Sequence, residues 1–535
     1  MNTAVAGVKL PSETTHEVHK FSTSIRERLS EELVVAFIGP VASGVSSVAR
    51  LVKKRLESEF RYDVPEIIKV SDFIRTYSSN VSEGSSLDQR IQSYQDAGNL
   101  LRANHGASIL ARLAVKRISE IRHKDGFEMG AADGMEIPKS VRRIYLIDSL
   151  KHPEEVDQLK EIYGNLFWLV GVFAPDYVRE ARLMALGVDR EKIYPILKRD
   201  QGEASEFGQK VRKAFSRSDF FIRNATESID NLNPIVNRFL DVLFGAEIRS
   251  PTVEESAMFH ATTAASKSAC MSRQVGAALV GSDDQLISVG WNDVPKFGGG
   301  LYEDAHMEQT PSDNDHRCYR WRERICHNDN EKAKIESKIV SGIRNALTKK
   351  AADAPLIKGA KQIPVTLSDE EIRGAIESSG ISSLIEFSRA IHAEMSAILA
   401  VARDKRHSLR DSTLVVTTYP CHNCARHIVA AGVVKVIYIE PYEKSLATHL
   451  HPDSISEDER DTNKCHFIQF EGFAPRHILD LFQVKGERKK LGKLLEVDRK
   501  EALPIYRRHL DSFTVYEDKV VSDVAQQFEV KENEA

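Results

Sequence analysis

Hydrophobic residues in the first half of the chain form short continuous runs, which longer amphipathic stretches separate. The runs predict buried strands at residues 33–39, 66–70, 142–148, 167–174 and 219–223. The stretches between them predict helices that begin at residue 46 and that span residues 96–122 and 176–187. Apolar strands that alternate with helices are typical of a parallel sheet with both faces covered. The pattern therefore predicts a doubly wound parallel-sheet α/β domain over residues 31–250.

The second half has a different pattern. It predicts a helix at 253–271 and strands at 275–280, 286–291, 413–418 and 433–440. A long polar insertion, residues 296–380, separates the second and third of these strands, and isoleucine or leucine at every fourth position from 335 to 347 predicts a helix within it. We expect a second α/β domain over residues 251–485, a flexible N-terminal arm at 1–30, and a charged, peripheral C-terminal segment at 486–535.

Charge and composition exclude several classes of protein. The chain of 535 residues has 74 Lys and Arg against 78 Asp and Glu, a formal net charge of −4. A dedicated nucleic-acid coat or a polybasic membrane binder would carry a strong basic excess. The longest apolar run is too short to span a bilayer, and the N-terminus lacks the pattern of a secretory signal. We therefore expect a cytoplasmic protein with no membrane partner.

The six cysteines are too few for a disulfide framework, but two of them form a C-x-x-C motif. His392, Cys421 and Cys424 supply one imidazole and two thiolates, which make three zinc ligands and leave the fourth position open for water. Glu394, two residues after the histidine, can take a proton from that water and deliver it to a ring nitrogen and to leaving ammonia. The order H-x-E…P-C-x-x-C is the signature of zinc nucleobase deaminases.

This pattern predicts one catalytic Zn²⁺ per chain, with Glu394 as the catalytic residue. The alternatives are half of a structural zinc knuckle, a redox pair of cysteines, and a histidine that is only part of the core. No second ligand pair of matching spacing follows the C-x-x-C motif.

A phosphate-loop pattern follows the first predicted strand. Residues 39–46, G-P-V-A-S-G-V-S, match G-x-x-x-x-G-K-[ST] except that Val45 replaces the lysine. The backbone between Gly39 and Gly44 and the helix start at Ser46 and Ser47 can still cradle a phosphate, but loss of the lysine should cripple phosphoryl transfer. We expect this loop to bind a nucleotide for regulation or scaffolding; an active kinase and a domain without a nucleotide remain alternatives.

Further residues extend that expectation. Asp148, at the end of a buried strand, stands where an acidic residue associated with Mg²⁺ would lie, so the nucleotide could be bound together with Mg²⁺. Four arginines could supply phosphate contacts: Arg90, Arg102, Arg179 and Arg182.

The insertion carries candidate chemistry of its own in C-Y-R-W-R-E-R-I-C-H, residues 318–327. Cys318, Cys326 and His327 could form a second, structural zinc site with another histidine or with Cys465. The alternative is that the two cysteines are buried free thiols and that the rest of the stretch is surface charge. The arginines of this stretch could bind a triphosphate or form a solvated helix face: Arg317, Arg320, Arg322 and Arg324.

Residues 252–442 resemble the cytidine and deoxycytidylate deaminase superfamily, in its deoxycytidylate branch. Four motifs carry the resemblance: S-R-Q-V-G-A-A-L-V (272–280), G-W-N-D-V-P (290–295), H-A-E-M-S-A-I-L (392–399) and T-T-Y-P-C-H-N-C-A-R-H-I (417–428). The resemblance implies a three-layer α/β/α fold.

It also implies roles for five residues around the metal. By this resemblance, Asn292 reaches the sugar or the base edge, and the backbone amide of Ala393 holds the pyrimidine carbonyl. Arg273 and Gln274 lie near the phosphates, and Tyr419 forms part of the pocket wall. Two alternatives without a substrate role remain: Asn292 could be a turn residue, and Arg273 could be a surface charge.

The first half resembles P-loop nucleotide kinases, and residues 31–485 together resemble the two-domain bacterial antiviral deoxycytidylate deaminases. That resemblance implies deamination of free dCTP and dCMP to dUTP or dUMP plus ammonia, which drains dCTP during phage infection. It further implies a homo-oligomer built from dimers, which can reach a hexamer, allosteric dTTP or dCTP, and an inhibitory small RNA. The alternatives are a deaminase of RNA or single-stranded DNA, a nucleotide-sensing scaffold with a vestigial deaminase, and a bifunctional kinase-deaminase.

Overall fold

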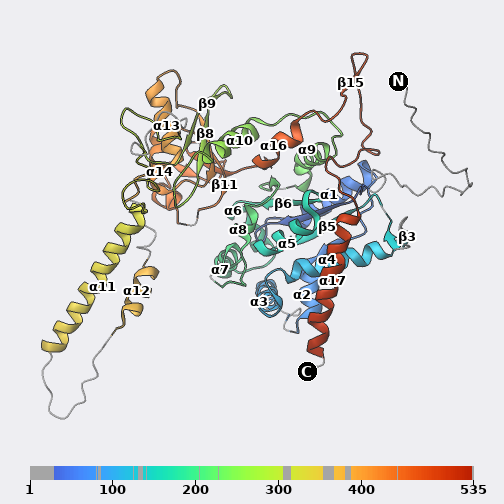
Figure 1. The fold of residues 1–535 in the computed structure, drawn as a ribbon, viewed down its shortest axis with the longest axis horizontal. Coiled ribbons are helices and arrows are strands. Elements are labelled where there is room, and N and C mark those ends of the chain that lie inside the picture. Colours follow the sequence, from blue (N-terminus) through green and yellow to red (C-terminus); the bar gives the residue numbers. More distant parts are fainter. Residues whose placement is uncertain are drawn as a thin grey trace, which may run out of the picture.

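A computed structural model describes residues 29–79, 81, 86–124, 126–129, 136–139, 141–203, 205–226, 228–304, 315–353, 367–379, 387–442 and 444–532. Two six-stranded sheets dominate the chain, one in each half, and helices pack against both (Figure 1). Parallel strand pairs prevail in the first sheet, which confirms the expected α/β class. Across the described residues, no helix is long and apolar enough to cross a membrane.

The first sheet has the strand order β14-β7-β6-β1-β5-β2. Its central strands are almost wholly buried because helices cover both faces, as their continuous apolar runs predict. The strands of this half are β1 (Leu33–Ile38), β2 (Ile67–Lys69), β5 (Ile144–Leu150), β6 (Phe167–Phe173) and β7 (Phe220–Arg223), with β3 (Phe127–Met129) and β4 (Glu136–Pro138) as a separate hairpin.

The helices of the first half follow the predicted periodicity with one correction. The helix predicted over residues 96–122 is two helices, α3 (Leu87–His105) and α4 (Ile109–His123). Gly106 ends the first of them with a φ of 96°, a backbone conformation that favours glycine. The other helices are α1 (Val45–Glu59), α2 (Val70–Tyr77), α5 (Pro153–Tyr163), α6 (Asp176–Ala185), α7 (Arg190–Gln201), α8 (Val211–Phe215) and α9 (Asn233–Leu243).

The second sheet has the order β12-β13-β11-β10-β8-β9. Its strands are β8 (Gly276–Val280), β9 (Leu286–Trp291), β10 (Thr413–Thr418), β11 (Lys435–Glu440), β12 (Ile455–Ser456) and β13 (Cys465–Gln469). Strands β10, β11, β13 and β12 pair in parallel, whereas β8 is antiparallel to both β10 and β9. The sequence patterns predict four of these strands, but not β12 and β13.

Two glycines show that helices pack closely on both faces of this sheet. A Cβ on Gly276 would lie 1.8 Å from the carbonyl oxygen of Ala261 in α10 (Val253–Ala265). A Cβ on Gly290 would lie 2.4 Å from backbone atoms of α13 (Ala393–Asp404). Gly290 pairs with Ala277, the neighbour of Gly276, so the two glycines face opposite sides of the sheet. The second half is therefore an α/β/α sandwich. Its remaining helices near the sheet are α14 (His422–Ala430), α15 (Ala447–Leu450) and α16 (Ile478–Phe482).

Part of the insertion forms an arm that projects from the second half (Figure 1). The arm contains α11 (His327–Asp353) and α12 (Asp369–Ser378), which pack on one another through Val340, Ile372 and Ile376. The apolar residue at every fourth position from 335 to 347 predicts the helix that α11 forms.

The two halves share one hydrophobic core. The cluster that contains β1, β5 and β6 continues through α10 to one face of the second sheet, including Val415 and Ile437. A strand of the second half, β14 (Gly472–Phe473), pairs antiparallel with β7 and so extends the first sheet. A short hairpin, β15 (Lys489–Lys490) and β16 (Lys493–Leu494), follows it.

The C-terminal segment corrects a prediction. Residues 486–535 are expected to be peripheral, but α17 (Asp511–Glu532) lies along α4 of the first half (Figure 1). Phe513 and Val524 of this helix are buried in the core. Glu517 is 1 % exposed and forms an ion pair with the equally buried Arg122 of α4. The many charged residues of this segment make the buried apolar residues of α17 hard to recognise in the sequence.

Candidate active site

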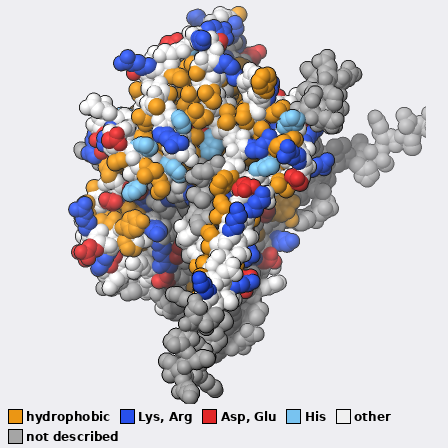
Figure 2. Space-filling view, turned by 90° about the vertical axis from the view of Figure 1, so that its left-hand side faces the viewer, with side chains coloured by type: hydrophobic (Ala, Val, Ile, Leu, Met, Phe, Trp, Pro, Cys, Tyr) orange, Lys and Arg blue, Asp and Glu red, His pale blue; other side chains and the backbone are white. Residues whose placement is uncertain are grey.

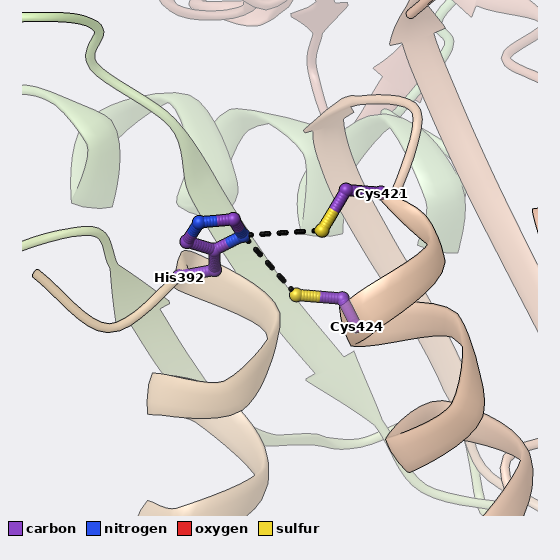
Figure 3. Close-up of side chains that lie close together, drawn as sticks. All are labelled: His392, Cys421 and Cys424. Carbon is purple, nitrogen blue, oxygen red and sulfur yellow. Dashed lines mark hydrogen bonds between the residues drawn. The ribbon is translucent and has the colours of Figure 1, made fainter. Parts of the chain in front are cut away.

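The N-termini of two helices bring together three side chains that could hold a metal ion. His392 immediately precedes α13, and Cys421 immediately precedes α14, which also carries Cys424 (Figure 3). The Nδ1 atom of His392 lies 3.4 Å from the Sγ atom of each cysteine. Within the described part of the chain, this is the one group of three or more His, Cys, Asp or Glu side chains close enough to hold a metal ion.

The donor chemistry of this group fits zinc. Cys421 has its pKa lowered to about 4, because the Cys424 thiol donates a hydrogen bond to it and His392 lies beside it. The pKa of His392 is raised to about 9, mainly through its hydrogen bond with Cys421. Both helix N-termini add positive potential that favours thiolates. One imidazole and two thiolates are three of the four ligands of a zinc ion, which leaves one position for water or substrate.

Glu394 lies in the first turn of α13, and it is only 4 % exposed. Burial raises its pKa above the usual value of a carboxyl group. A buried carboxyl group beside a cluster of candidate metal ligands is suited to take up and release a proton during a reaction.

A cavity of about 270 Å³ opens onto these residues. It is lined by the predicted substrate-binding residues Arg273, Asn292, Ala393 and Tyr419, together with His392, Glu394 and Cys421. Gln274 does not line it; its side-chain amide donates to the carbonyl of Ser268.

Several predicted substrate-binding side chains also have partners within the protein. The side-chain oxygen of Asn292 accepts a hydrogen bond of 2.7 Å from the Val275 amide, and its nitrogen donates to the Arg273 carbonyl, also at 2.7 Å. Arg273 forms an ion pair of 2.5 Å with Glu440, and both side chains are partly exposed. Asn292 therefore fixes the segment that carries Arg273.

The insertion supplies part of the pocket wall, which sequence reasoning does not anticipate. Cys318, Cys326 and His327 line the cavity with Arg389 and Tyr442. Arg389 lies over the Trp321 ring, 3.9 Å from its centroid, and donates to the carbonyl of His316. The position of Arg389, three residues before His392, is the one sequence signal that points to it.

The possible second zinc site does not form among the described residues. Cys465 lies on β13 in the core, where burial raises its pKa to about 12, whereas the other three candidates line the catalytic cavity. Arg317 is buried and pairs with Asp315 and Asp304, so it serves the fold of the insertion. Arg320 and Arg322 lie near the rings of Tyr319 and Trp321.

The phosphate-loop pattern lies between β1 and α1, and Gly44 has the φ of 86° that favours glycine. Asp200 accepts a hydrogen bond of 2.6 Å from the Val41 amide, and Lys151 donates to the Gly39 carbonyl. The side-chain amide of Asn224 donates to the Ser43 carbonyl. The protein's own side chains therefore hold this loop.

The other predicted phosphate-contacting residues of the first half also have protein partners or lie at the surface. Arg179 donates to the Val41 carbonyl and Arg182 to the Ala42 carbonyl. Arg102 pairs with the buried Glu155, and Asp148 is buried on β5. Val45 is buried at the start of α1, Ser46 is exposed, and Ser47 accepts a hydrogen bond from Arg50.

Comparison with known protein families gives a match in the second half of the chain. Residues 251–440 match the family described as the cytidine and deoxycytidylate deaminase zinc-binding region. The deoxycytidylate deaminases of Enterobacteria phages T2 and T4 are 44 % identical over 55 residues, which is 10 % of this chain. That stretch covers less than a third of either relative, 29 % and 28 % of their lengths.

The first half has a different relative. A UPF0200 protein of Saccharolobus solfataricus is 23 % identical over 194 residues, or 36 % of this chain and 84 % of that protein.

Solved structures give weak overall superpositions. The dCMP deaminase of cyanophage S-TIM5, in complex with dCMP and dUMP, aligns with a TM-score of 0.21 and 17 % identity, over 42 % of this chain and 99 % of the other. TT1252 from Thermus thermophilus gives 0.24 and 18 %, over 40 % and 98 %. The stretch that matches the family, residues 251–440, includes the three clustered residues His392, Cys421 and Cys424. This match does not depend on the superpositions. The second half of this protein therefore contains a zinc-binding domain of the cytidine and deoxycytidylate deaminase family.

Proposed function

We propose that this protein is a zinc-dependent hydrolase that deaminates free deoxycytidine nucleotides, dCMP, dCTP or both, to the deoxyuridine nucleotide and ammonia. One observation carries the proposal. His392, Cys421 and Cys424 meet at one point, and the buried Glu394 lies beside them in a cavity of about 270 Å³. The match to the deoxycytidylate deaminases of two phages supports the choice of substrate.

A zinc ion held by these three side chains would supply Lewis-acid chemistry, lowering the pKa of a water molecule. Glu394 then has two tasks. Its carboxylate takes a proton from the attacking water and passes it to N3 of the cytosine ring. It then takes the proton of the hydroxyl group that has been added at C4 and transfers it to the amine, so that C4 becomes a carbonyl as the C–N bond breaks and ammonia leaves. The atoms balance as one water consumed and one ammonia released.

The remaining pocket residues hold the substrate in this proposal. Ala393 is the first residue of α13 and lines the pocket, so its backbone amide, at a helix N-terminus, is suited to the O2 carbonyl of the base. Tyr419 closes one wall. Arg273, at the rim and partly exposed, is placed to exchange its pairing with Glu440 for a substrate phosphate.

A polynucleotide substrate fits the surface less well. Single-stranded nucleic acid is usually bound along a continuous basic groove with stacking aromatic side chains. The face from which the arm projects instead shows basic and acidic side chains interspersed with hydrophobic ones (Figure 2).

The experiment is a product analysis with purified, zinc-loaded protein. The substrates are dCMP, dCTP, CMP, CTP and a cytosine-containing oligonucleotide, and the readouts are the uracil product by chromatography and the ammonia released. We expect turnover of dCMP or dCTP, and none with Glu394→Ala that still contains one zinc per chain. Conversion of the oligonucleotide alone would refute the proposal, as would equal rates for Glu394→Ala and wild type.

We also propose that the reaction serves antiviral defence by draining dCTP, as the resemblance to two-domain antiviral deaminases implies. Cells that express the wild-type protein should lose dCTP and gain dUMP after phage infection, whereas cells with Glu394→Ala should not. Unchanged deoxynucleotide pools in infected wild-type cells would contradict this role.

A further inference from the structure

A second cavity, of about 220 Å³, lies between the two halves of the chain. The first half contributes Pro40, Phe173 and Arg179 to its wall, and the second half contributes Tyr438, Glu457 and Gln469. Its volume is close to that of the catalytic cavity, about 270 Å³, so it can hold a ligand of comparable size.

The topology of the first sheet places this cavity where doubly wound folds bind ligands. The chain leaves β1 for β2 on one side of the sheet, and later reaches β6 and β7 on the other side of β1. The strand order therefore reverses between β1 and β6, and ligands of such sheets bind outside the carboxyl ends of the strands at this point. Pro40 follows β1, and Phe173 ends β6. In this protein the second half covers the crevice.

One charged group in the wall, Arg179, has a nitrogen atom without a hydrogen-bond partner among the described residues. Arg179 is fully buried, with a relative exposure of 0 %. Its Nε donates to the Val41 carbonyl and its Nη1 pairs with Asp176, but its Nη2 has no hydrogen-bond partner. A buried guanidinium N–H without an acceptor costs stability, so an acceptor supplied by a ligand would recover that cost.

The guanidinium group of Arg212 and the partly protonated carboxyl group of Glu457 also lie in the polar wall. Arg212 of α8 lies in the same wall, hydrogen-bonded to Gln201. Glu457 is opposite in sign, but burial raises its pKa to about 7, so it is partly protonated near neutral pH. If both acids were fully ionised, Asp176 and Glu457 would cancel the charges of the two arginines. Because Glu457 is partly protonated, the net charge of this wall is positive.

The rest of the wall is aromatic. Phe173, Phe215 and Tyr438 line the cavity, and Tyr438 stacks edge-on against Tyr419 with ring centroids 4.8 Å apart. Flat apolar rings beside guanidinium groups suit a ligand that has both a planar ring and an anionic group.

We propose that this cavity binds one phosphorylated nucleoside, with its phosphate toward Arg179 and Arg212 and its ring among the aromatic side chains. The phosphate-loop pattern contributes only Pro40 to the wall of this site, and the Val41 amide of that loop is already bonded to Asp200. It is also distinct from the catalytic cavity, and it does not depend on the deaminase activity proposed above.

The two cavities share a wall. Tyr419 and Tyr442 line both, and the Tyr419 hydroxyl group donates to Glu457 at 3.5 Å. Tyr419 is two residues before the metal ligand Cys421. A ligand that displaces Glu457 or Tyr438 therefore changes the packing behind the catalytic pocket.

The test is isothermal titration calorimetry on the full-length, zinc-loaded protein. The probes are the purine and pyrimidine deoxynucleoside monophosphates and inorganic phosphate. We expect at least one nucleoside monophosphate to bind this site, and Arg212→Met to weaken its binding at least tenfold. Lys213→Met is the matched control, because Lys213 is the exposed neighbour on the same helix, and it should change the affinity less than twofold. Arg212→Met leaves the backbone contacts of Arg179 in place, so it avoids the misfolding that loss of Arg179 could cause.

Three outcomes overturn the proposal: no nucleotide binds in a manner that depends on Arg212, inorganic phosphate binds as tightly as every nucleotide, or Lys213→Met weakens binding as much as Arg212→Met. Deamination of dCMP and of dCTP is measured on the same preparations, each substrate without other nucleotides. Turnover of either substrate without Arg212-dependent binding refutes the second site alone. Arg212-dependent binding without turnover of either substrate refutes the proposed function alone.

Discussion

Single side chains in the candidate active-site cavity both line the cavity and hold the surrounding backbone. Asn292 is the clearest example, because its amide bonds two backbone groups of residues 273–275 while its side chain lines the cavity. A side chain that uses one of its two N–H donors and its oxygen on the backbone acts on a substrate largely through the segment that it holds.

Asn292→Ala should therefore lower both stability and substrate affinity. Loss of the two hydrogen bonds leaves the Val275 amide and the Arg273 carbonyl short of partners, which costs about 1–3 kcal/mol in the free energy of unfolding. Urea denaturation measures this cost, and steady-state kinetics should show a raised KM for dCMP. Asn328→Ala, a change of another polar residue in the same cavity wall, is the control. An unchanged stability with a lost kcat would indicate direct contact with the reacting base instead.

The cluster of candidate metal ligands could be predicted from a sequence motif, and four further lining residues from a resemblance, but the contributions of the insertion, Arg389 and Tyr442 could not, for a physical reason. Zinc imposes residue types and a tight local spacing, as in Cys421 and Cys424, so a short motif carries most of the geometry. Arg389 and Tyr442 reach the pocket only through the packing of distant segments, and no local pattern records that. The hydrogen-bond partners of Arg179 and of Asn292 also could not be predicted from the sequence, because they depend on how the folded chain packs.

At the scale of elements, close approach of helices to the second sheet sets the position of the metal ligands. Gly276 allows α10 to lie directly on β8, and Gly290 does the same for α13, which begins next to His392. Strands were predictable where they are continuous apolar runs, but the very short β14 has no such signal. The break between α3 and α4 was missed because apolar periodicity continues past Gly106.

Gly276→Ala should destabilise the second half strongly. The added Cβ would lie 1.8 Å from a backbone oxygen, so α10 must move away from the sheet. We expect a loss of about 3 kcal/mol or more in the free energy of unfolding. Gly342→Ala, in α11 with open space around the position, should be neutral or stabilising by up to about 1 kcal/mol. Circular dichroism during thermal unfolding compares them, and equal melting temperatures would contradict the packing argument.

At the scale of the whole molecule, a buried charge cluster joins the two halves. Asp219, next to β7, pairs with Arg476 at 2.6 Å and His477 at 2.8 Å, both from the segment that follows β14. Burial alone would raise the pKa of Asp219, but the hydrogen bond from His477 and the charges of Arg476 and Lys160 lower it to about 2.

This pKa predicts an acid-sensitive junction. The folded pKa lies below that of an unfolded Asp, near 3.8, so the stabilisation is complete above pH 4 or so and is lost as pH falls through 2. The stabilisation is about 2 kcal/mol. Denaturant titrations from pH 5 to pH 2 should show wild type losing that much more stability than Asp219→Asn. Asp157→Asn, a partly exposed acid paired with Arg217, should follow wild type, and a parallel loss in Asp219→Asn would refute the assignment.

The C-terminal helix makes a second junction. Phe513 of α17 is 1 % exposed and packs near Tyr163, whereas Val515 is 67 % exposed on the same helix. Phe513→Ala should lower the free energy of unfolding by about 3–5 kcal/mol. Val515→Ala should change it by less than about 0.5 kcal/mol. Urea denaturation followed by fluorescence distinguishes them; equal effects would show that α17 does not belong to the core.

The pairing of β14 with β7 has a consequence for the history of the gene. The second half contributes β14 to the first sheet, so replacing the second half with a segment of another protein would leave the edge of β7 unpaired. Substitutions along β7 should be accompanied by compensating changes around residues 472–477. The two halves should therefore be inherited as a unit.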